Sequence, residues 1–144
     1  MRGNGALGGY ALEEQIGFVL RKAQQRASAI FARHFGRYQL TPTQWTTLVR
    51  IHEEGSLSQN HLGRLTAMDP ATIQGVVERL IERGLLTRIA DPHDRRRKRL
   101  GLTPQGQRLV RRLVKRALKV SSDTLRPLAP RERTQVRELL ERLG

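Results

Sequence analysis

Arginine side chains are the most prominent chemical groups of this sequence. Its 144 residues include 27 Lys and Arg against 13 Asp and Glu, a formal net charge of +14, and only four of the basic residues are lysines. Residues 88–116 hold eleven basic residues against Asp91 and Asp94. A planar guanidinium donates two parallel hydrogen bonds and so suits phosphate and guanine. A GC-rich genome would also favour Arg over Lys, but concentration in one segment indicates a surface for a polyanion, of which nucleic acid is the commonest.

Residue types that serve catalysis and metal binding are scarce. The chain has no cysteine, which excludes disulfides, thiolate metal sites and cysteine nucleophiles. Histidines at positions 34, 52, 61 and 93 form no HxH or HxxxH pair, so we expect no metal site and no cofactor. Neither a glycine-rich phosphate loop nor a recognisable catalytic triad is present, and the sequence therefore predicts a protein that is not an enzyme.

Helical patterns precede the basic segment. Apolar residues at three- and four-residue spacing predict a long helix over residues 11–36, ended by Gly36. A capping box at Thr41–Gln44, with proline at the first helical position, opens a second helix, whose apolar face carries Trp45 and His52.

Two further helices follow closely. Ser58 is a suitable N-cap for a short helix that buries Leu62 and Leu65. Asp69-Pro70 then begins a helix over residues 69–83, and Gly84 closes it. Its inward residues are Ile73, Val76, Val77, Leu80 and Ile81.

The basic segment itself has the pattern of a hairpin. Residues 85–89 and 98–102 predict two strands, joined by the turn-forming residues 91–94. Thr103-Pro104 caps a long helix after the hairpin, and a last amphipathic helix follows Pro130.

This order predicts a mainly α fold with a small β-hairpin wing, that is, a winged helix-turn-helix with additional terminal helices. We expect a flexible tail over 1–10 and one domain over 11–144, with the DNA-binding region at 41–103. The helices of 11–36 and 104–144 have apolar stripes without a partner in so small a domain, so we expect a homodimer. No apolar run is long enough to cross a membrane. We therefore expect no membrane partner and a cytoplasmic protein.

Three ordered motifs resemble the MarR family of bacterial transcription regulators. They are Leu80-Ile81-Glu82-Arg83-Gly84-Leu85, Asp91-Pro92-His93-Asp94-Arg95-Arg96 and Leu102-Thr103-Pro104-Gln105-Gly106. The resemblance implies a two-fold dimer joined by its terminal helices, with a recognition helix in the major groove and a wing arginine in the minor groove of double-stranded DNA. It also implies a repressor that leaves a pseudo-palindromic operator when a small, often aromatic, molecule binds.

In this family the helix over 69–83 would be the recognition helix. Gln74 is the best candidate for reading a base edge, because its amide can pair bidentately with adenine. Thr72 can contact a phosphate or a thymine methyl group, and Gly75 allows close approach. The outward residues expected to contact DNA are Ala71, Thr72, Gln74, Gly75 and Arg79. Ser58 and Gln59 are further phosphate candidates, although a helix cap explains Ser58 equally well.

The family match makes Arg96 the minor-groove residue and Asp94 the carboxylate that orients it. Arg95 and Arg97 are expected to neutralise phosphates, and Arg99 to be a solvated basic residue. A narrow A·T minor groove attracts an inserted guanidinium because its negative potential is enhanced.

Aromatic residues gather in the first two helices, where related proteins have their ligand cavity. Candidates for binding an aromatic acid or its thioester are Phe31, His34, Arg37, Tyr38, Trp45 and His52. A packed core with satisfied histidines is the alternative for each of them. For the whole chain, the alternative is an architectural, nucleoid-type DNA-binding protein without an inducer.

Overall fold

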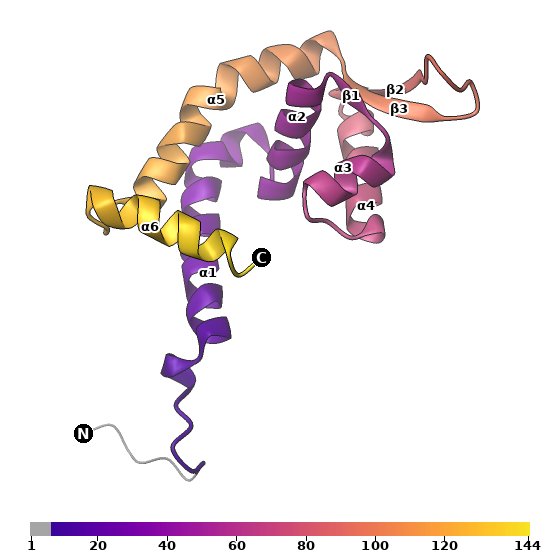
Figure 1. Ribbon diagram of the computed structural model, residues 1–144. Coiled ribbons are helices and arrows are strands. Elements are labelled where there is room, and N and C mark those ends of the chain that lie inside the picture. Colours follow the sequence, from indigo (N-terminus) through magenta and orange to yellow (C-terminus); the bar gives the residue numbers. More distant parts are fainter. Residues whose placement is uncertain (1–6) are drawn as a thin grey trace.

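The computed structural model describes residues 7–144 and consists of a helical part joined to a small mixed α and β part (Figure 1). Its helices are α1 (Ile16–Phe35), α2 (Pro42–Glu54), α3 (Gln59–Leu65), α4 (Pro70–Glu82), α5 (Pro104–Leu125) and α6 (Pro130–Glu141). Short 3-10 turns occupy Leu12–Glu14 and Gly36–Tyr38, and the strands are β1 (Ser56–Leu57), β2 (Leu86–Ala90) and β3 (Lys98–Leu102). The long helices α1 and α5 lie against each other, while α2, α3, α4 and the sheet form the other part.

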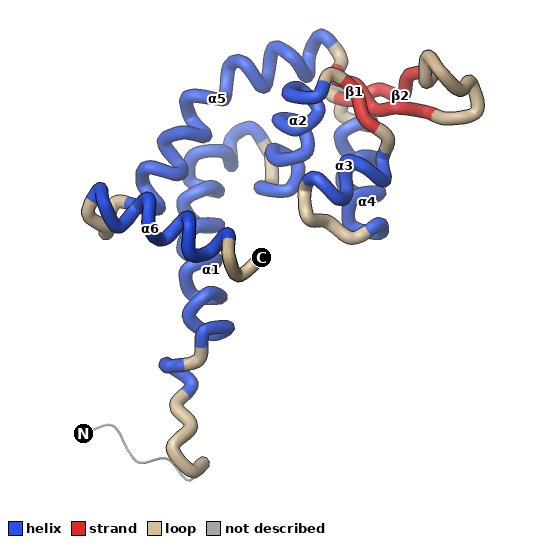
Figure 2. The backbone as a smooth tube through the Cα atoms, in the orientation of Figure 1, coloured by secondary structure: helices blue, strands red, loops and turns tan. Residues whose placement is uncertain are grey.

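The sheet has the antiparallel order β1-β3-β2. Its strands are the red segments of Figure 2. Leu86 pairs with Leu102 and Ala90 with Lys98, so the hairpin predicted from the sequence is confirmed, with its first strand displaced by one residue. The two-residue strand β1 was not expected and pairs through Ser56 with Gly101. With α3 and α4, this sheet makes the winged helix-turn-helix that the sequence predicts.

Four side-chain caps begin the helices where the sequence indicated. Thr41 accepts a hydrogen bond from the Gln44 amide and the Gln44 side chain returns one, so the capping box is confirmed. Ser58 caps α3, Asp69 caps α4 and Thr103 caps α5. Each cap satisfies an N–H group that the first turn of a helix leaves free.

One hydrophobic core joins the two parts. Phe35 is fully buried and stacks on Phe31 with ring centroids 4.3 Å apart. Leu62 of α3 and Leu80 of α4 are fully buried as expected. The expectation for Leu65 was wrong, because α3 ends at this residue and leaves its side chain 37% exposed.

The first helix also differs from its prediction at both ends. It begins at Ile16 rather than near residue 11, because Gln15 is extended and separates it from the preceding 3-10 turn. Gly36 does not reverse the chain, since its φ of −56° is right-handed. A 3-10 turn continues instead, and Gln39 adopts the left-handed φ of 53°. Of the expected tail, residues 1–6 lie outside the described part of the chain, and residues 7–9 form a turn.

Apolar side chains remain exposed along the terminal helices. Ile16 is 63% exposed, Leu118 67% and Leu143 67%. Further exposed apolar residues are Leu12, Val19, Leu20, Val114, Leu139 and Leu140. None of the helices within residues 7–144 is both long enough and apolar enough to span a bilayer.

Candidate nucleic-acid interface

The first turns of α4 present a short polar face. Asp69 accepts hydrogen bonds from the Thr72 amide at 2.9 Å and from the Thr72 hydroxyl at 2.7 Å, and these bonds lower the pKa of the Asp69 carboxyl. Because its hydrogen points at Asp69, the Thr72 hydroxyl offers only its lone pairs and its methyl group to an outside partner. Ala71 beside it is exposed.

Gln74 lies one turn further along this face. Its Nε2 atom donates one hydrogen to Oε1 of Glu78 at 3.2 Å, which leaves the amide carbonyl and the second N–H of the side chain free for another partner. A side chain on Gly75 would meet nothing within 4 Å, so the backbone is open there. Arg79 is exposed on the following turn. Glu78 was not singled out from the sequence, although its i+4 spacing from Gln74 was a usable signal.

The start of α3 is a helix cap in the structure. The Ser58 hydroxyl accepts from the His61 amide at 3.2 Å, and both Ser58 and Gln59 are half-buried. This hydrogen bond occupies one lone pair of the hydroxyl and leaves its hydrogen available.

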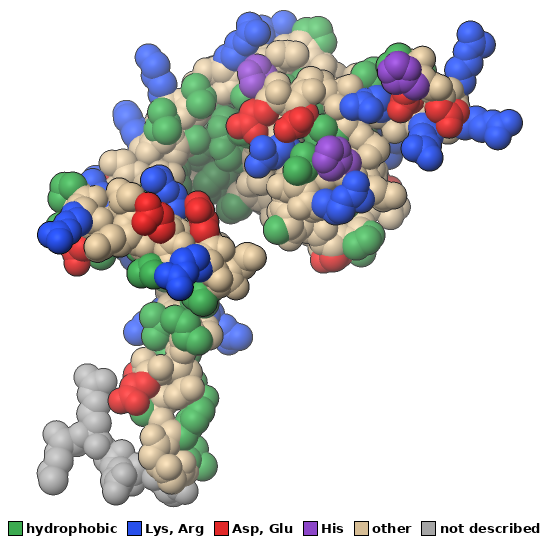
Figure 3. All heavy atoms as spheres, in the orientation of Figure 1, with side chains coloured by type: hydrophobic (Ala, Val, Ile, Leu, Met, Phe, Trp, Pro, Cys, Tyr) green, Lys and Arg blue, Asp and Glu red, His purple; other side chains and the backbone are tan. Residues whose placement is uncertain are grey.

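We call β2, β3 and the connecting residues 91–97 the wing. Its loop projects away from α3 and α4, and Lys and Arg side chains extend from its tip (Figure 3). Asp91 accepts from the His93 amide at 2.8 Å, and this bond, with the nearby charge of Arg99, lowers the pKa of the Asp91 carboxyl. These contacts give the loop a defined turn.

Asp94 organises the arginines of the wing. It accepts a hydrogen bond from the Arg96 amide at 3.0 Å, while its other carboxylate oxygen lies 3.7 Å from Nε of Arg97. Asp94 therefore contacts the backbone of Arg96 and, separately, the side chain of Arg97. Arg95 and Arg96 are exposed, and neither forms an ion pair within residues 7–144. The guanidinium of Arg96 is thus free at the tip of a fixed turn.

The expectation of a solvated Arg99 was wrong. Its Nε atom donates to the Ser56 hydroxyl at 2.9 Å, and its guanidinium lies 3.9 Å from the Asp91 carboxylate. Arg99 of the central strand β3 therefore links the edge strand β1, through Ser56, to the first residue of the loop after β2, Asp91. No sequence pattern indicates this contact, since β1 has only two residues and is too short to show a strand pattern.

The six residues considered for ligand binding do not share one pocket. Phe31 and Trp45 line a groove of about 340 Å³ between α1, α2 and α5. Tyr38 lines a different cavity, and the guanidinium of Arg37 lies 5.6 Å from the Tyr38 ring centroid. The remaining lining residues of the groove are Pro42, Thr46, Val49, Val114, Ala117, Leu118, Val120 and Ser121.

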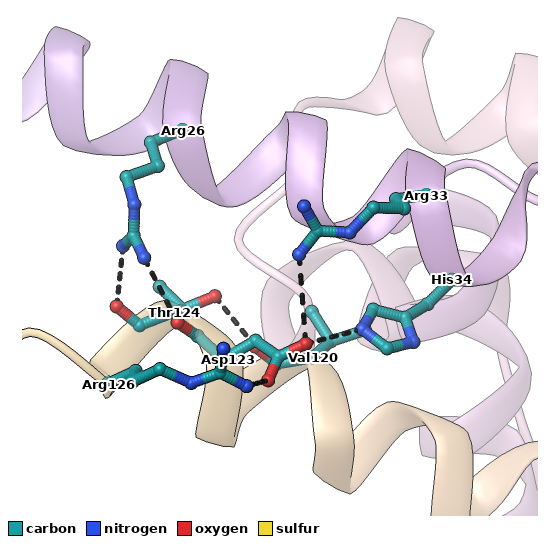
Figure 4. A network of polar contacts seen from close by, with 7 residues as sticks. All are labelled: Arg26, Arg33, His34, Val120, Asp123, Thr124 and Arg126. Atoms are coloured by element: carbon teal, nitrogen blue, oxygen red, sulfur yellow. Dashed lines mark hydrogen bonds and ion pairs between the residues drawn. The ribbon is translucent and has the colours of Figure 1, made fainter.

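The two histidines of that set are placed apart from the groove. His34 of α1 binds the carboxylate of Asp123 in α5, with Nε2 and Oδ2 at 2.7 Å (Figure 4). His52 is exposed, which corrects its assignment to the apolar face of α2, since Leu48 and Ile51 define that face. Asp123 was missed from the sequence, although it is the one acidic residue of α5. No cluster of three or more potential metal ligands occurs in the part of the chain that the structure describes.

Comparisons with known proteins agree with this geometry. Residues 38–97 match a family model described as the MarR family. The HTH-type transcriptional repressor NicR of Pseudomonas putida is 39% identical over 134 residues, which are 93% of this chain and 85% of NicR.

Solved structures extend the similarity over nearly the whole chain. A probable transcriptional regulator from Pseudomonas aeruginosa is 50% identical with a TM-score of 0.89, covering 93% of this chain and 100% of that one. BpsR from Bordetella bronchiseptica, whose DNA binding is regulated by 6-hydroxynicotinic acid, is 38% identical with a TM-score of 0.89. The match covers 94% of this chain and 97% of the BpsR chain.

Proposed function

The chain belongs to the MarR family, and from this premise we propose that it is a homodimeric, sequence-specific repressor that a small aromatic ligand releases from its operator. Its relatives are named as transcriptional regulators, and its winged helix-turn-helix is of the DNA-binding type. A regulator of bacterial genes acts in the cytoplasm and needs no catalytic site.

The free guanidinium of Arg96 is the observation that carries the proposal. The Asp94 carboxylate fixes the backbone of Arg96, while the side chain projects from the tip of the wing without an ion pair among residues 7–144. Because the backbone of Arg96 is already held, only its side chain must become ordered when the guanidinium enters a narrow minor groove, whose negative potential attracts it. Arg95 and Arg97 on either side then neutralise phosphates, which fixes the register of the protein on the duplex.

The first turns of α4 would read the adjacent major groove. The Gln74 carbonyl is left free, because Glu78 accepts a hydrogen bond from the amide nitrogen. A free carbonyl accepts from the amino group of adenine or cytosine. Thr72 and Ala71 contribute methyl groups beside it, and Gly75 permits close approach. Ser58, Gln59 and Arg79 would contact the phosphates at the two edges of this surface.

Dimerisation would cover the apolar side chains of the terminal helices. Ile16, Leu118 and Leu143 are each more than half exposed, although large apolar side chains gain free energy from burial. A second copy with the same stripe offers a self-complementary partner, as two-fold symmetry requires. Two recognition helices would then lie one helical turn of DNA apart, roughly 10 base pairs.

The groove between α1, α2 and α5 suits the ring of an aromatic effector. Phe31, Trp45 and Val49 make its wall apolar, and the hydroxyls of Thr46 and Ser121 provide polar contacts. BpsR responds to 6-hydroxynicotinic acid, an aromatic acid small enough for a groove of about 340 Å³. No charged residue lines the groove within residues 7–144, so the ring, rather than the carboxylate, would supply most of the binding free energy.

Selection from a random DNA pool with the purified protein tests the proposal. We expect a two-fold symmetric motif with half-sites roughly 10 base pairs apart, and a dimer by sedimentation. Recovery of unrelated sequences would favour an architectural protein instead. A monomer that still selects one half-site would contradict the proposed dimerisation but not the proposed sequence-specific binding.

A further inference from the structure

A second cavity lies beside the end of α4 and the first three turns of α5, whereas the groove described above borders a later stretch of α5. Its volume is about 600 Å³. It is lined by Tyr38 of the 3-10 turn, by Arg83 and Leu85 after α4, and by Gln105, Arg108, Leu109 and Arg112 of α5.

Positive charge dominates the wall of this cavity. Arg83, Arg108 and Arg112 line it, and no acidic side chain of residues 7–144 does. Within residues 7–144 neither Arg108 nor Arg112 forms an ion pair with a carboxylate. Arg83 donates only to the backbone carbonyls of Gln39 and Tyr38, at 2.6 and 2.9 Å. Charges of one sign around a concave surface reinforce each other and attract a counter-ion.

More arginine surrounds the aromatic residue of this wall. The guanidinium carbons of Arg37, Arg112 and Arg116 lie 5.6, 5.7 and 5.5 Å from the centroid of the Tyr38 ring. Each contact is a cation–π interaction, which holds these side chains near the cavity. The ring neutralises no charge, and the positive potential of the cavity therefore remains.

The cavity also has an apolar floor. Leu85 is buried and Leu109 is half-buried, and both line it beside the Tyr38 ring. A bare inorganic ion would leave this surface unused. The lining therefore fits a molecule that combines an anionic group with an organic part.

DNA is an unsuitable source for the anion. The residues of α4 that would read bases, Ala71 to Gly75, are in its first two turns, and Arg83 follows its last turn, roughly 12 to 18 Å further along the helix axis. Arg79 would contact only a phosphate at the edge of that surface, and it does not line the cavity. The wing is oriented in the same way as α4. Leu86 and Leu102 lie at the end of its strands opposite the arginine-bearing loop. The ends of α4 and of the wing that lie nearest the cavity are thus the ends away from the proposed base contacts and from the arginine-bearing loop.

We propose that this cavity binds an organic phosphate, as a ligand site separate from the aromatic groove. Three guanidiniums match the several oxygens and the double negative charge of a phosphate better than they match one carboxylate. Leu85, Leu109 and the Tyr38 ring receive the organic part. The site does not depend on the proposed repressor function, since it needs neither an operator nor the effector of the groove.

Titration calorimetry with inorganic pyrophosphate, at constant ionic strength, tests the charged part of the site. The test variant combines Arg108→Gln with Arg112→Gln, two exposed positions on α5. Its control combines Arg111→Gln with Lys115→Gln, which removes the same charge from the same helix outside the cavity. We expect one pyrophosphate per wild-type chain, affinity about tenfold or more weaker in the test variant, and affinity within about twofold of wild type in the control.

The salt dependence of DNA binding separates the two sources of phosphate. Each lost phosphate contact lowers the slope of log affinity against log salt by about 0.9. We expect equal slopes for the test and control variants, because Arg108 and Arg112 do not touch DNA. A lower slope in the test variant alone would overturn the proposal, as would absent pyrophosphate binding or equal weakening in both variants.

Discussion

Nε2 of His34 lies 2.7 Å from Oδ2 of Asp123, and the two side chains are each only 17% exposed (Figure 4). Arg126 pairs with the other carboxylate oxygen, and Arg33 lies 3.7 Å from the first. Arg26 donates to the backbone carbonyls of Asp123 and Thr124. The contacts of Arg26, Arg33 and His34 hold α1 against α5, and both helices border the aromatic groove.

Replacing this carboxylate should make the protein less stable in a pH-dependent way. The hydrogen bond from His34 lowers the pKa of the Asp123 carboxyl, and the charge of Arg126 lowers it further. A lowered folded-state pKa stabilises the fold fully above the unfolded-state pKa of about 3.9, and this contribution is lost as the pH falls through the folded-state pKa. Asp123→Asn should therefore unfold at lower urea concentration than wild type at neutral pH, with a difference that shrinks below about pH 4.

The measurement is urea unfolding at a fixed protomer concentration, because stability of an oligomer depends on concentration. Glu54→Gln is the control, since Glu54 forms no ion pair in the described residues. A difference that stayed constant from neutral to acid pH would mean that Asp123 stabilises the fold through packing rather than through its charge.

Arg96→Ala should weaken binding to a selected duplex by roughly 1–3 kcal/mol, or about 5- to 150-fold. The reason is that the wing presents this guanidinium exposed and unpaired. Fluorescence anisotropy across a salt series measures both the affinity and its salt slope. Arg111→Ala, on the exposed face of α5, should change neither appreciably. Unchanged affinity and slope in the Arg96 variant would remove it from the interface.

Gln74→Ala should relax base preference at one position of each half-site. The lost interaction is the hydrogen bond from a base amino group to the amide carbonyl that the Glu78 contact leaves free. Repeating the duplex selection with the variant gives the comparison directly. Arg79→Ala is a useful partner, because loss of a phosphate contact should weaken binding without altering the selected motif. A motif identical to that of the wild type would assign Gln74 to the helix surface only.

The sequence predicts those features of the structure that depend on interactions between residues close together in the chain. Caps and helical spacing are local, and Thr41, Ser58, Asp69 and Thr103 begin their helices as predicted. The hairpin is local too, and only the bounds of its first strand differ from the prediction, by one residue.

Contacts between distant segments could not be read from the sequence. Arg99 bonds to Ser56, 43 positions away, and His34 to Asp123, 89 positions away. A sequence pattern around Arg99 or His34 contains only near neighbours in the chain, and these say nothing of such distant partners. The candidate ligand residues separated for the same reason: Phe31 and Tyr38 are close in sequence, yet the chain turns between them and places them in different cavities.

Gly106→Ala should destabilise the fold, although it replaces glycine by a better helix former. A Cβ atom at this position would lie 2.2 Å from the carbonyl oxygen of Leu85, which is backbone and cannot move aside. Overpacking of this kind costs roughly 1–3 kcal/mol. Thermal unfolding followed by circular dichroism measures the effect. Gly75→Ala, whose added methyl group would meet nothing within 4 Å, is the matched control and should be neutral or stabilising.

Filling the aromatic groove should remove the response to its ligand. Thr46 lines the groove at an exposed position, so Thr46→Trp can place a ring there without disturbing the core. A saturating ligand that binds only the folded state raises the melting temperature. We expect 6-hydroxynicotinic acid to raise that of the wild type and of Thr46→Ser, but not that of Thr46→Trp. A full shift in the tryptophan variant would place the effector elsewhere.

The ratio of affinities for the selected duplex and a scrambled duplex of equal length and composition is the most direct test of sequence-specific binding. Anisotropy titrations at low and at physiological salt provide this ratio. For a specific regulator we predict that the selected duplex binds about a thousandfold or more tightly at physiological salt, while binding to the scrambled duplex falls steeply as salt rises. Equal affinities at both salt concentrations would contradict the repressor account and leave only the electrostatic attraction of a basic protein for DNA.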